Sequence, residues 1–415
     1  MNDLIPRFPH LMEQILQKLD NKDLVKSREV ARLWQDIIDG KNYPWLRIVE
    51  IPTLLSLIRK YTYLHLAAKL NQIDMFKVIL DSEPDKNLVN DNECTPFLLS
   101  CLSGSVKIVE FLLEKSDELK IDLSRKSRFG CTAFHLACIS GKSELAELIM
   151  KNCRKLKIGL NEMDDFSKTG FVYACEHGRL EIVEMLMNNC ESMMIDLNTL
   201  DKNNFNAFHF ACRSAHSEIA KILMEESTKF KLDPNAKVKW GSTAFHLACE
   251  SGSTGIVNMM LDQSVFDLSL KTRMNFTTGF HFACIQGRTN IVKILIDKSE
   301  FHKLDLGAKD SEGSTGFHFA CRFGYTSIVK MLLDASESLN LDLTAKTDWG
   351  STGFHYACRF GNTSIVEMLL DASESLNLDL TAKTELGSTG YQMAVIWKEL
   401  DVIDVIKNKM PSLIV

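Results

Sequence analysis

A histidine and a cysteine three positions apart recur along the chain, and they are the side chains in it best suited to chemistry. On a helix this spacing puts an imidazole and a thiol on one face, where they could supply two of the four ligands that Zn²⁺ needs. The pairs are His135/Cys138, His209/Cys212, His246/Cys249, His281/Cys284, His318/Cys321 and His355/Cys358. A metal site is therefore one hypothesis for these pairs, although each pair lacks two ligands.

Helix capping is the second hypothesis for the same histidines, and the sequence favours it. Thr132 stands at the start of a predicted helix, and His135, three residues on, can reach back to hydrogen-bond it. Other copies of the phrase carry Leu98, Val172 or Gln392 in place of the histidine. Packing tolerates such replacements better than a row of metal sites would.

Eight of the twelve cysteines occupy one equivalent position: Cys101, Cys138, Cys175, Cys212, Cys249, Cys284, Cys321 and Cys358. Stacked helices lie about 8 to 10 Å apart, whereas a disulfide needs α-carbons within about 7 Å. We expect these thiols to be reduced, buried and small, with a redox role as the alternative. Cys94 and Cys131, just before the Thr of the phrase, are expected to be exposed.

The chain contains none of the motifs that typically carry catalysis. There is no glycine-rich nucleotide loop, no His-Glu-x-x-His motif and no Gly-x-Ser-x-Gly motif. No Ser, His and Asp set stands outside the recurring phrase. We therefore expect a non-catalytic protein with no cofactor and no metal.

The phrase that holds the His/Cys pairs occurs ten times, so the helices that position them belong to a repeat. Copies run from TAFHLAC at 132–138 to TGFHYAC at 352–358, with weaker copies on both sides. At the histidine position the copies stand at residues 65, 98, 135, 172, 209, 246, 281, 318, 355 and 392. The step is 33 once, 35 once and otherwise 37. A fixed period of this size predicts stacked supersecondary units.

The phrase resembles the T-P-L-H-x-A signature of ankyrin repeats, and each copy continues with an I-V-x-x-L-L helix, as at residues 108–113. One unit cannot bury the apolar stripe of that helix, so neighbouring units must stack. The resemblance covers residues 61–412. It implies an all-α ankyrin-repeat solenoid of about ten helix-turn-helix units with short hairpin-like turns, and it implies protein binding.

Two features depart from the family pattern. The signature proline is kept only at Pro96. The period is mostly 37 residues, against about 33 in the family, and four residues are nearly one helical turn. We therefore expect the second helix of each unit to be one turn longer. Residues 314–350 and 351–387 are near copies, and the divergent last unit, from about 388, is expected to cap the stack.

Residues 1–48 have a different pattern and are predicted to form a small helical module, joined to the repeats by residues 49–60. Apolar residues at i, i+3, i+4 and i+7 predict one helix from Met12 to Leu19 and another from Val30 to Ile37. So much apolar surface in so few residues makes a marginal core, which indicates that a partner covers part of it.

The N-terminal module resembles an F-box. The resemblance rests on Phe8-Pro9, Ile15, Leu16, Leu19, Asp23-Leu24, Val30, Arg32, Trp34 and Trp45-Leu46. It implies binding to the Skp-family adaptor of a cullin-RING ubiquitin ligase. The residues implied in that interface are Pro9, Ile15, Leu16, Leu19, Leu24, Val30 and Trp34. A plain helical cap on the open end of the solenoid is the alternative.

The charge balance argues against two classes of partner. A net charge of −6 and the absence of clustered Lys and Arg leave nothing to neutralise phosphates or anionic lipid. Pro6, Pro9 and charged residues interrupt the N-terminus before an apolar run of signal-peptide length. We expect no nucleic-acid partner, no membrane partner and a cytoplasmic location, with the nucleus left open.

Candidate target-binding residues lie at the turn tips and just after each Ala-Cys, on the concave face that ankyrin proteins use. Trp and Arg dominate interface hot spots, and exposed aromatic tips are costly unless something covers them. The candidates are Phe129, Phe166, Trp240 and Trp349 at the tips, and Arg213, Glu250, Arg322, Phe323, Arg359 and Phe360 after Ala-Cys. Alternatively, each ring packs on the neighbouring tip.

Together the two resemblances imply a substrate-recognition adaptor of a Skp/cullin/F-box type ubiquitin ligase that holds an unknown protein target through its repeats. An ankyrin scaffold or inhibitor with no link to ubiquitination is the alternative function.

Overall fold

The computed structural model describes residues 63–82 and 85–414, and every regular element in these residues is a helix. The predicted all-α fold is thereby confirmed. The N-terminal module, the segment 49–60 and all seven residues assigned to the Skp interface lie outside the described residues. By its internal contacts the chain divides into two compact units, Met1–Asp196 and Leu197–Val415.

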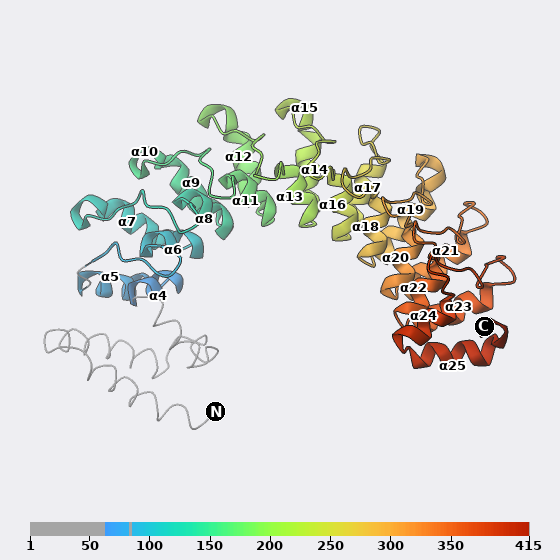
Figure 1. Cartoon of the computed structure of the whole chain (residues 1–415). Coiled ribbons are helices and arrows are strands. Elements are labelled where there is room, and N and C mark those ends of the chain that lie inside the picture. Colours follow the sequence, from blue (N-terminus) through green and yellow to red (C-terminus); the bar gives the residue numbers. More distant parts are fainter. Residues whose placement is uncertain (1–62, 83–84, 415) are drawn as a thin grey trace, which may run out of the picture. The chain divides into compact units, whose positions relative to one another are not determined.

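Helices of the first unit are arranged in antiparallel pairs joined by tight turns (Figure 1). The pairs are α4 (Tyr63–Lys69) with α5 (Ile73–Ser82), α6 (Pro96–Ser103) with α7 (Val106–Leu119), α8 (Ala133–Ser140) with α9 (Ser143–Lys151) and the one-turn α10 (Cys153–Leu156), and α11 (Gly170–Glu176) with α12 (Leu180–Met193). The first helices pack in the order α4, α6, α8 and α11, and the second helices pack beside them as α5, α7, α9 and α12.

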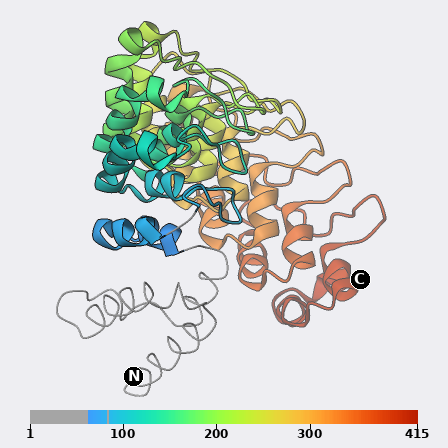
Figure 2. The ribbon, with the colours of Figure 1, turned by 90° about the vertical axis from the view of Figure 1, so that its left-hand side faces the viewer.

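The second unit continues the pattern with six pairs. They are α13 (Ala207–Arg213) with α14 (Ser217–Glu225) and α15 (Ser227–Phe230), α16 (Ala244–Ser251) with α17 (Thr254–Leu261), α18 (Gly279–Ile285) with α19 (Thr289–His302), α20 (Gly316–Phe323) with α21 (Thr326–Ala335), α22 (Gly353–Arg359) with α23 (Thr363–Ala372), and α24 (Gly390–Trp397) with α25 (Leu400–Lys409) and the 3₁₀ turn η2 (Pro411–Leu413). In each unit the loops extend from the helices to one side (Figure 2).

Each first helix from α6 onward begins after a residue that caps it. Thr315, before α20, has extended backbone angles (φ −103°, ψ 171°) and forms a capping box with His318. The helix then ends at Gly324, whose φ of 77° places it in the left-handed region that glycine adopts without strain. These two signals make the first helices short, with at most eight residues each.

The predicted extra turn is present in most second helices. α7, α12 and α19 each run for 14 residues. After α21 the chain makes one more turn, closed by a 3.0 Å hydrogen bond from the Leu339 amide to the Ala335 carbonyl, and ends at the left-handed Asn340. In the unit with a step of 35, α17 has only eight residues and lacks this turn. The four additional residues therefore lengthen the helix and do not form an irregular loop.

Hairpin tips join neighbouring repeats through one backbone hydrogen bond each. In the first unit the Asp165 amide donates to the Phe129 carbonyl at 3.0 Å. In the second unit the Arg273 amide donates to the Trp240 carbonyl at 2.9 Å, and the Glu385 amide donates to the Trp349 carbonyl at 3.0 Å. These backbone bonds, here called the tip ladder, fix the positions of Phe129, Trp240 and Trp349 relative to the next repeat.

The last helix pair covers the preceding pair, as predicted for a terminal unit. Val402 and Ile406 of α25 are fully buried, and α25 packs on α23. The outward side of the pair is not uniformly polar, because Val395, Ile396 and Leu400 are exposed. An apolar surface therefore remains at the end of the second unit.

Glycine at the first helical position makes room for the preceding repeat. A Cβ on Gly316 would lie 2.5 Å from the Phe280 ring and 2.9 Å from Cys284 Sγ. Such distances are far inside van der Waals contact, so the ring would have to move. Phe280 is itself buried, and a packed interior resists that movement.

We predict that Gly316→Ala lowers the melting temperature, although alanine is the better helix former by about 1 kcal/mol. The forced shift of Phe280 should cost about 1–3 kcal/mol in unfolding free energy. Gly307→Ala is the matched control, because the nearest atom to its Cβ would be Asp305 Oδ1 at an ordinary 3.7 Å. Thermal unfolding followed by circular dichroism measures both. Equal melting temperatures for the two variants would contradict the packing argument.

Candidate functional site

The recurring histidines form capping boxes, which confirms the capping hypothesis. In α8 the Thr132 amide donates to His135 Nδ1 at 3.1 Å, and the Thr132 hydroxyl lies 2.8 Å from the same nitrogen. Asn206 replaces Thr before α13 and its amide donates to His209 Nδ1 at 3.2 Å. Because Nδ1 accepts from a backbone N–H, each of these imidazoles is neutral and carries its proton on Nε2.

The second ring nitrogen links each repeat to the following one. His135 Nε2 donates to the Lys168 carbonyl at 3.0 Å, and His318 Nε2 donates to the Ala345 carbonyl at 2.9 Å. His65 makes the equivalent bond to the Cys94 carbonyl at 2.8 Å. From His135 onward each histidine of the row therefore holds its own helix start and the next hairpin at once, and it has no nitrogen left for a metal.

Burial keeps these imidazoles neutral. Desolvation lowers the pKa of His209, His246 and His318 to about 4. The same cause lowers the pKa of the other members of the row, His65, His135, His281 and His355. Backbone carbonyls that accept from Nε2 act in the opposite direction but do not offset the desolvation.

The cysteines are packing side chains. All twelve are free thiols, and the eight at the equivalent position are fully buried. Burial raises the pKa of those thiols far above its usual range, which makes them poor nucleophiles and poor metal ligands. Within the described ranges, no group of three or more His, Cys, Asp or Glu side chains could hold a metal ion.

The expectation that Cys94 and Cys131 are exposed was wrong. Both are buried, because they lie at the hairpin base, where the next repeat covers them. Cys131 Sγ lies 3.8 Å from Asp164 Oδ2 in that repeat, and burial raises the pKa of Cys94 to about 11. Sequence position before the Thr does not reveal this contact across repeats.

Two predicted Arg-Phe pairs and one further ring form a continuous stack in the second unit, here called the ring ladder: Phe323, Arg322, Phe360, Arg359 and Trp397. Cζ of Arg322 lies 5.5 Å from the centroid of Phe323 and 5.3 Å from that of Phe360. Cζ of Arg359 lies 5.4 Å from Phe360 and 4.5 Å from Trp397. Each guanidinium therefore lies between the rings of two successive repeats.

Further aromatic side chains support the ring ladder from within its own helices. Phe319 stacks on Phe323 with ring planes 11° apart, and Tyr356 stacks on Phe360 with planes 12° apart, both at 6.5 Å between centroids. The rings of His318 and Tyr356 are nearly perpendicular, at 85°, with centroids 5.9 Å apart. The ladder is thus tied to the capping histidines and has little freedom to rearrange.

Trp397 is a residue of this surface that the sequence prediction missed. It stands 37 positions after Phe360, which itself stands 37 after Phe323. The repeat step was therefore the signal that could have found it. The divergent sequence of the last unit hid the match, because Ile396 replaces the arginine there.

Arg213 and Glu250 occupy the same position in earlier repeats of the second unit but do not join the ring ladder. Arg213 lies over the ring of Phe205, with Cζ 5.7 Å from its centroid. The Glu250 carbonyl accepts a 2.8 Å hydrogen bond from Arg288 Nε. The position after Ala-Cys therefore recurs along these repeats, whereas the stack of rings and guanidinium groups is confined to α20, α22 and α24.

The predicted tip aromatics differ in how much their neighbours cover them. Phe129 and Phe166 contact each other at 5.9 Å in the first unit, and Trp240 packs on the buried Phe205 at 5.5 Å in the second. Both contacts agree with the local-packing alternative. Trp349 is different: its side chain is 62% exposed, and no ring contact forms to it in the part of the chain that the structure describes.

The tips and the ring ladder are separate groups. The tips precede the first helices, whereas Arg322 and Phe323 end one, and an eight-residue helix spans about 12 Å. In an earlier repeat a tip and a residue after Ala-Cys do share a contact, because Trp240 and Arg213, which is outside the ring ladder, both contact the ring of Phe205. The predicted residues therefore do not form a single patch.

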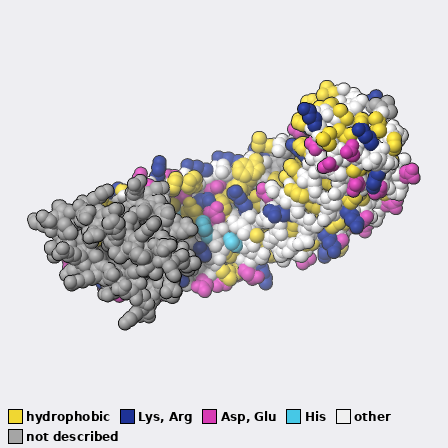
Figure 3. Space-filling model, turned by 90° about the horizontal axis from the view of Figure 1, so that it is seen from below, with side chains coloured by type: hydrophobic (Ala, Val, Ile, Leu, Met, Phe, Trp, Pro, Cys, Tyr) yellow, Lys and Arg dark blue, Asp and Glu magenta, His cyan; other side chains and the backbone are white. Residues whose placement is uncertain are grey.

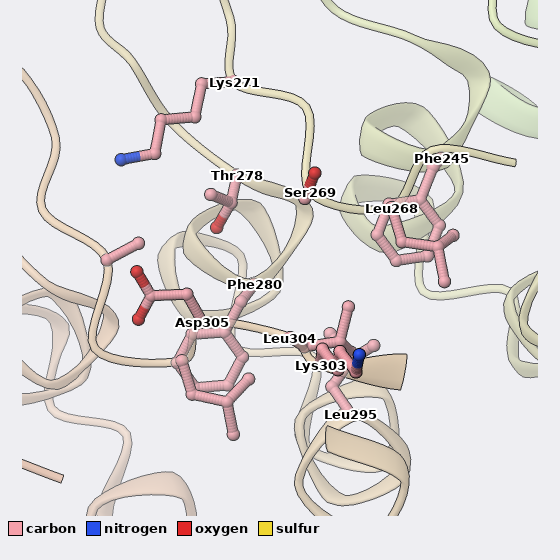
Figure 4. A pocket seen from close by; sticks show the side chains of 12 residues that line it. Phe245, Leu268, Ser269, Lys271, Thr278, Phe280, Leu295, Lys303, Leu304 and Asp305 are labelled. Carbon is pink, nitrogen blue, oxygen red and sulfur yellow. The ribbon is translucent and has the colours of Figure 1, made fainter. Parts of the chain in front are cut away.

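A hollow of about 200 Å³ lies between two repeats of the second unit, beside Phe245, Phe280, Leu295, Lys271 and Asp305 (Figure 4). Its walls are mostly apolar, and it opens to solvent. Sites for drug-sized ligands typically enclose about 300–1,000 Å³. The hollow therefore does not support a small-molecule function. No helix in the described ranges is both long and apolar enough to cross a membrane.

Comparisons with known proteins identify two modules. A family model described as ankyrin repeats (3 copies) matches residues 64–158, 152–237, 228–303, 245–344, 281–383 and 317–411. A model described as the F-box domain matches residues 5–46. Among solved structures, the chain is similar to the human ASB11 ankyrin repeat domain, with 21% identity, a TM-score of 0.49 and coverage of 58% of this chain and 98% of that one. A search of curated proteins gave no match.

We predict that the repeats lose stability steeply as the pH falls from about 6.5 toward 4. The folded pKa of the buried histidines lies below the ordinary value of 6.5, so their contribution is complete above that value and is lost as the unfolded chain takes up protons. Each histidine contributes a slope of about 1.4 kcal/mol per pH unit. Thermal unfolding across this range measures the effect.

A His318→Gln variant provides the control for the pH prediction. Gln392 shows that glutamine can form the same box, since its Oε1 accepts from the Thr389 amide at 3.0 Å. The variant should remain folded and show a shallower loss of melting temperature below pH 6.5. A pH dependence identical to that of the parent chain would show that His318 does not titrate as argued.

Trp349→Ala should leave the melting temperature unchanged, whereas Trp240→Ala should lower the unfolding free energy. Trp240 loses its contact with Phe205, and aromatic pairs contribute about 0.5–1.5 kcal/mol beyond area burial. Trp349 has no such ring contact within the described residues. Urea unfolding of both variants measures the difference. Destabilisation by Trp349→Ala would instead indicate local packing at this tip.

Proposed function

Because the chain belongs to the ankyrin-repeat family and carries an F-box domain ahead of its repeats, we propose that it is the substrate-recognition adaptor of a Skp/cullin/F-box type ubiquitin ligase. The F-box domain would bind the Skp-family adaptor, and the repeats would hold a protein target. The observation that carries the proposal is the order of the two modules, with the F-box at residues 5–46 and the repeats from residue 64.

The proposed mechanism is positioning. A target held on the repeats is kept near the ligase that the F-box recruits, so its modification becomes effectively intramolecular, with no chemistry performed by the chain. The His/Cys pairs fit this role because they are committed to structure: the imidazoles cap helices and the thiols are buried. We place the protein in the cytoplasm, with the nucleus as a second location.

A target needs a surface that keeps its shape when the target is absent. Within the second unit, three kinds of contact tie each repeat to the next: the histidine bond, the tip ladder and a bond near the end of each first helix. In the last of these, Asn362 Nδ2 donates to the Cys321 carbonyl at 2.7 Å. Such preorganisation reduces the entropy that binding would otherwise cost.

An ankyrin scaffold or inhibitor is the alternative function. The repeats would serve it equally well, so their structure does not separate the two functions. The F-box match supports the ligase adaptor, because a scaffold has no need of a module that binds a ligase adaptor.

We predict that replacing Leu16 and Leu19 by Ala abolishes binding of the Skp-family adaptor while target binding persists. The two leucines belong to the predicted first helix of the F-box match. Losing both side chains from an interface should cost about 2 kcal/mol or more, which is at least about thirtyfold in affinity. Pull-down of the full chain with purified Skp adaptor measures the binding.

Gln14→Ala with Gln17→Ala is the matched control, since these polar residues alternate with the leucines in the same segment. The control should bind the adaptor like the parent chain. If the parent chain itself binds no Skp adaptor, the ligase proposal fails and the scaffold function takes its place.

A further inference from the structure

The two guanidinium groups of the ring ladder have aromatic partners but no anionic ones. Among the described residues, neither Arg322 nor Arg359 forms an ion pair, although other surface cations do, such as Lys409 with Asp371 at 2.8 Å. Arg359 Nε is also buried without a hydrogen-bond partner in this part of the chain. Stacking leaves the planar donors of a guanidinium free to bind a carboxylate.

The ring ladder is exposed and lies next to apolar side chains. Phe323, Phe360 and Trp397 are between 42% and 51% exposed, and Ile396 and Leu400 are exposed still further. In Figure 3, hydrophobic side chains lie beside basic and acidic ones at the right-hand end, which the C-terminal helices form. Exposed apolar surface that contains aromatic side chains and arginines is typical of a protein-interaction site.

The positive charge of Arg322 and Arg359 determines which kind of partner the ring ladder can bind. Rings on an otherwise neutral surface attract cations, but here their faces already hold two guanidinium groups, which would repel a second cation. One acidic group of this region, the Glu399 carboxylate, lies over Gly361, but within the described residues it forms no ion pair with Arg322 or Arg359. Two guanidinium groups without an anionic partner therefore lie together on a chain whose net charge is −6.

We propose that the ring ladder binds an acidic segment of a protein partner, with one carboxylate on Arg322, one on Arg359 and apolar side chains over Phe323, Phe360 and Trp397. The two arginines are one repeat apart, and stacked helices are separated by about 8–10 Å. A segment in the polyproline II conformation has three residues per turn and advances about 3.1 Å per residue, so acidic residues three positions apart lie on one face and match that distance. This inference deepens the proposed target-binding role of the repeats.

The test is a selection from a random peptide library on the purified full chain, followed by fluorescence anisotropy with the peptide that is most enriched. We expect enrichment of peptides with two acidic residues beside apolar ones. Replacing the acidic residues of that peptide by their amides should weaken binding at least about tenfold, because charged pairs with guanidinium are the stronger hydrogen bonds. Binding should also weaken as salt rises, since exposed charges are screened.

Arg322→Gln with Arg359→Gln should remove the binding of the selected peptide, while Arg213→Gln should leave it unchanged. Arg213 is the matched control because it occupies the same repeat position and also lies over a ring, yet it is outside the ladder. Circular dichroism checks that each variant is folded. Should the double variant unfold, Arg322→Lys with Arg359→Lys replaces it, and that variant should weaken binding while keeping the salt dependence.

Several results would overturn the inference. Enrichment of peptides without acidic residues would do so, and so would equal losses in the Arg213→Gln and double variants. Self-association of the chain through the ladder, detected by sedimentation and lost in the double variant, would identify a second copy as the occupant instead. Preferential binding of an oligonucleotide probe over the acidic peptide would identify nucleic acid. None of these measurements involves the Skp adaptor, so they fail or succeed independently of the ligase proposal.

Discussion

A neutral imidazole connects neighbouring repeats wherever the recurring phrase keeps its histidine, which is in seven of the ten copies. It accepts from the cap residue of its own helix through Nδ1 and donates to the next repeat through Nε2, so a single ring fixes both a helix start and a repeat interface. The geometry requires one tautomer and no charge, which is why burial and a lowered pKa accompany it. The hairpin tips and the ring ladder of the histidine-bearing repeats are placed relative to these helices, so their positions depend on this bond.

Most of the fold could be predicted from the sequence because it depends on the repeat period and on the apolar stripe along each second helix. The His-x-x-Cys phrase located the first helices, and four additional residues per unit indicated the longer second helix. The short α17 could have been predicted too, since its unit lacks two of those residues. Local rules work here because each repeat makes most of its contacts within itself and with its immediate neighbours.

Contacts between repeats were harder to predict, and this explains why the burial of Cys131 and the place of Trp397 were missed. Asn235 bridges two loops by donating to the Val265 carbonyl at 2.7 Å and accepting from the Asp267 amide at 3.0 Å, yet nothing in its local sequence marks it. Cys131 is buried by the following repeat for the same reason. The candidate surface shows the same limit: residue types predicted Arg322 and Phe323, but only stacking in space joined them to Trp397.

The near-identical repeats 314–350 and 351–387 bear on how the ring ladder arose. Arg322-Phe323 and Arg359-Phe360 are unchanged between them, and the differences nearby keep the same contacts. Tyr356 stacks as Phe319 does, and Asn362 bonds the preceding first helix as Tyr325 does through its 3.2 Å bond to the Ile285 carbonyl.

Copying a repeat therefore adds one guanidinium and one ring at a fixed step, without disturbing the interface beneath. A surface built in this way gains binding groups in register, because the spacing between charges is set by the stacking distance of the helices and not by loops. The same step that makes the fold predictable thus determines the spacing that a partner has to match.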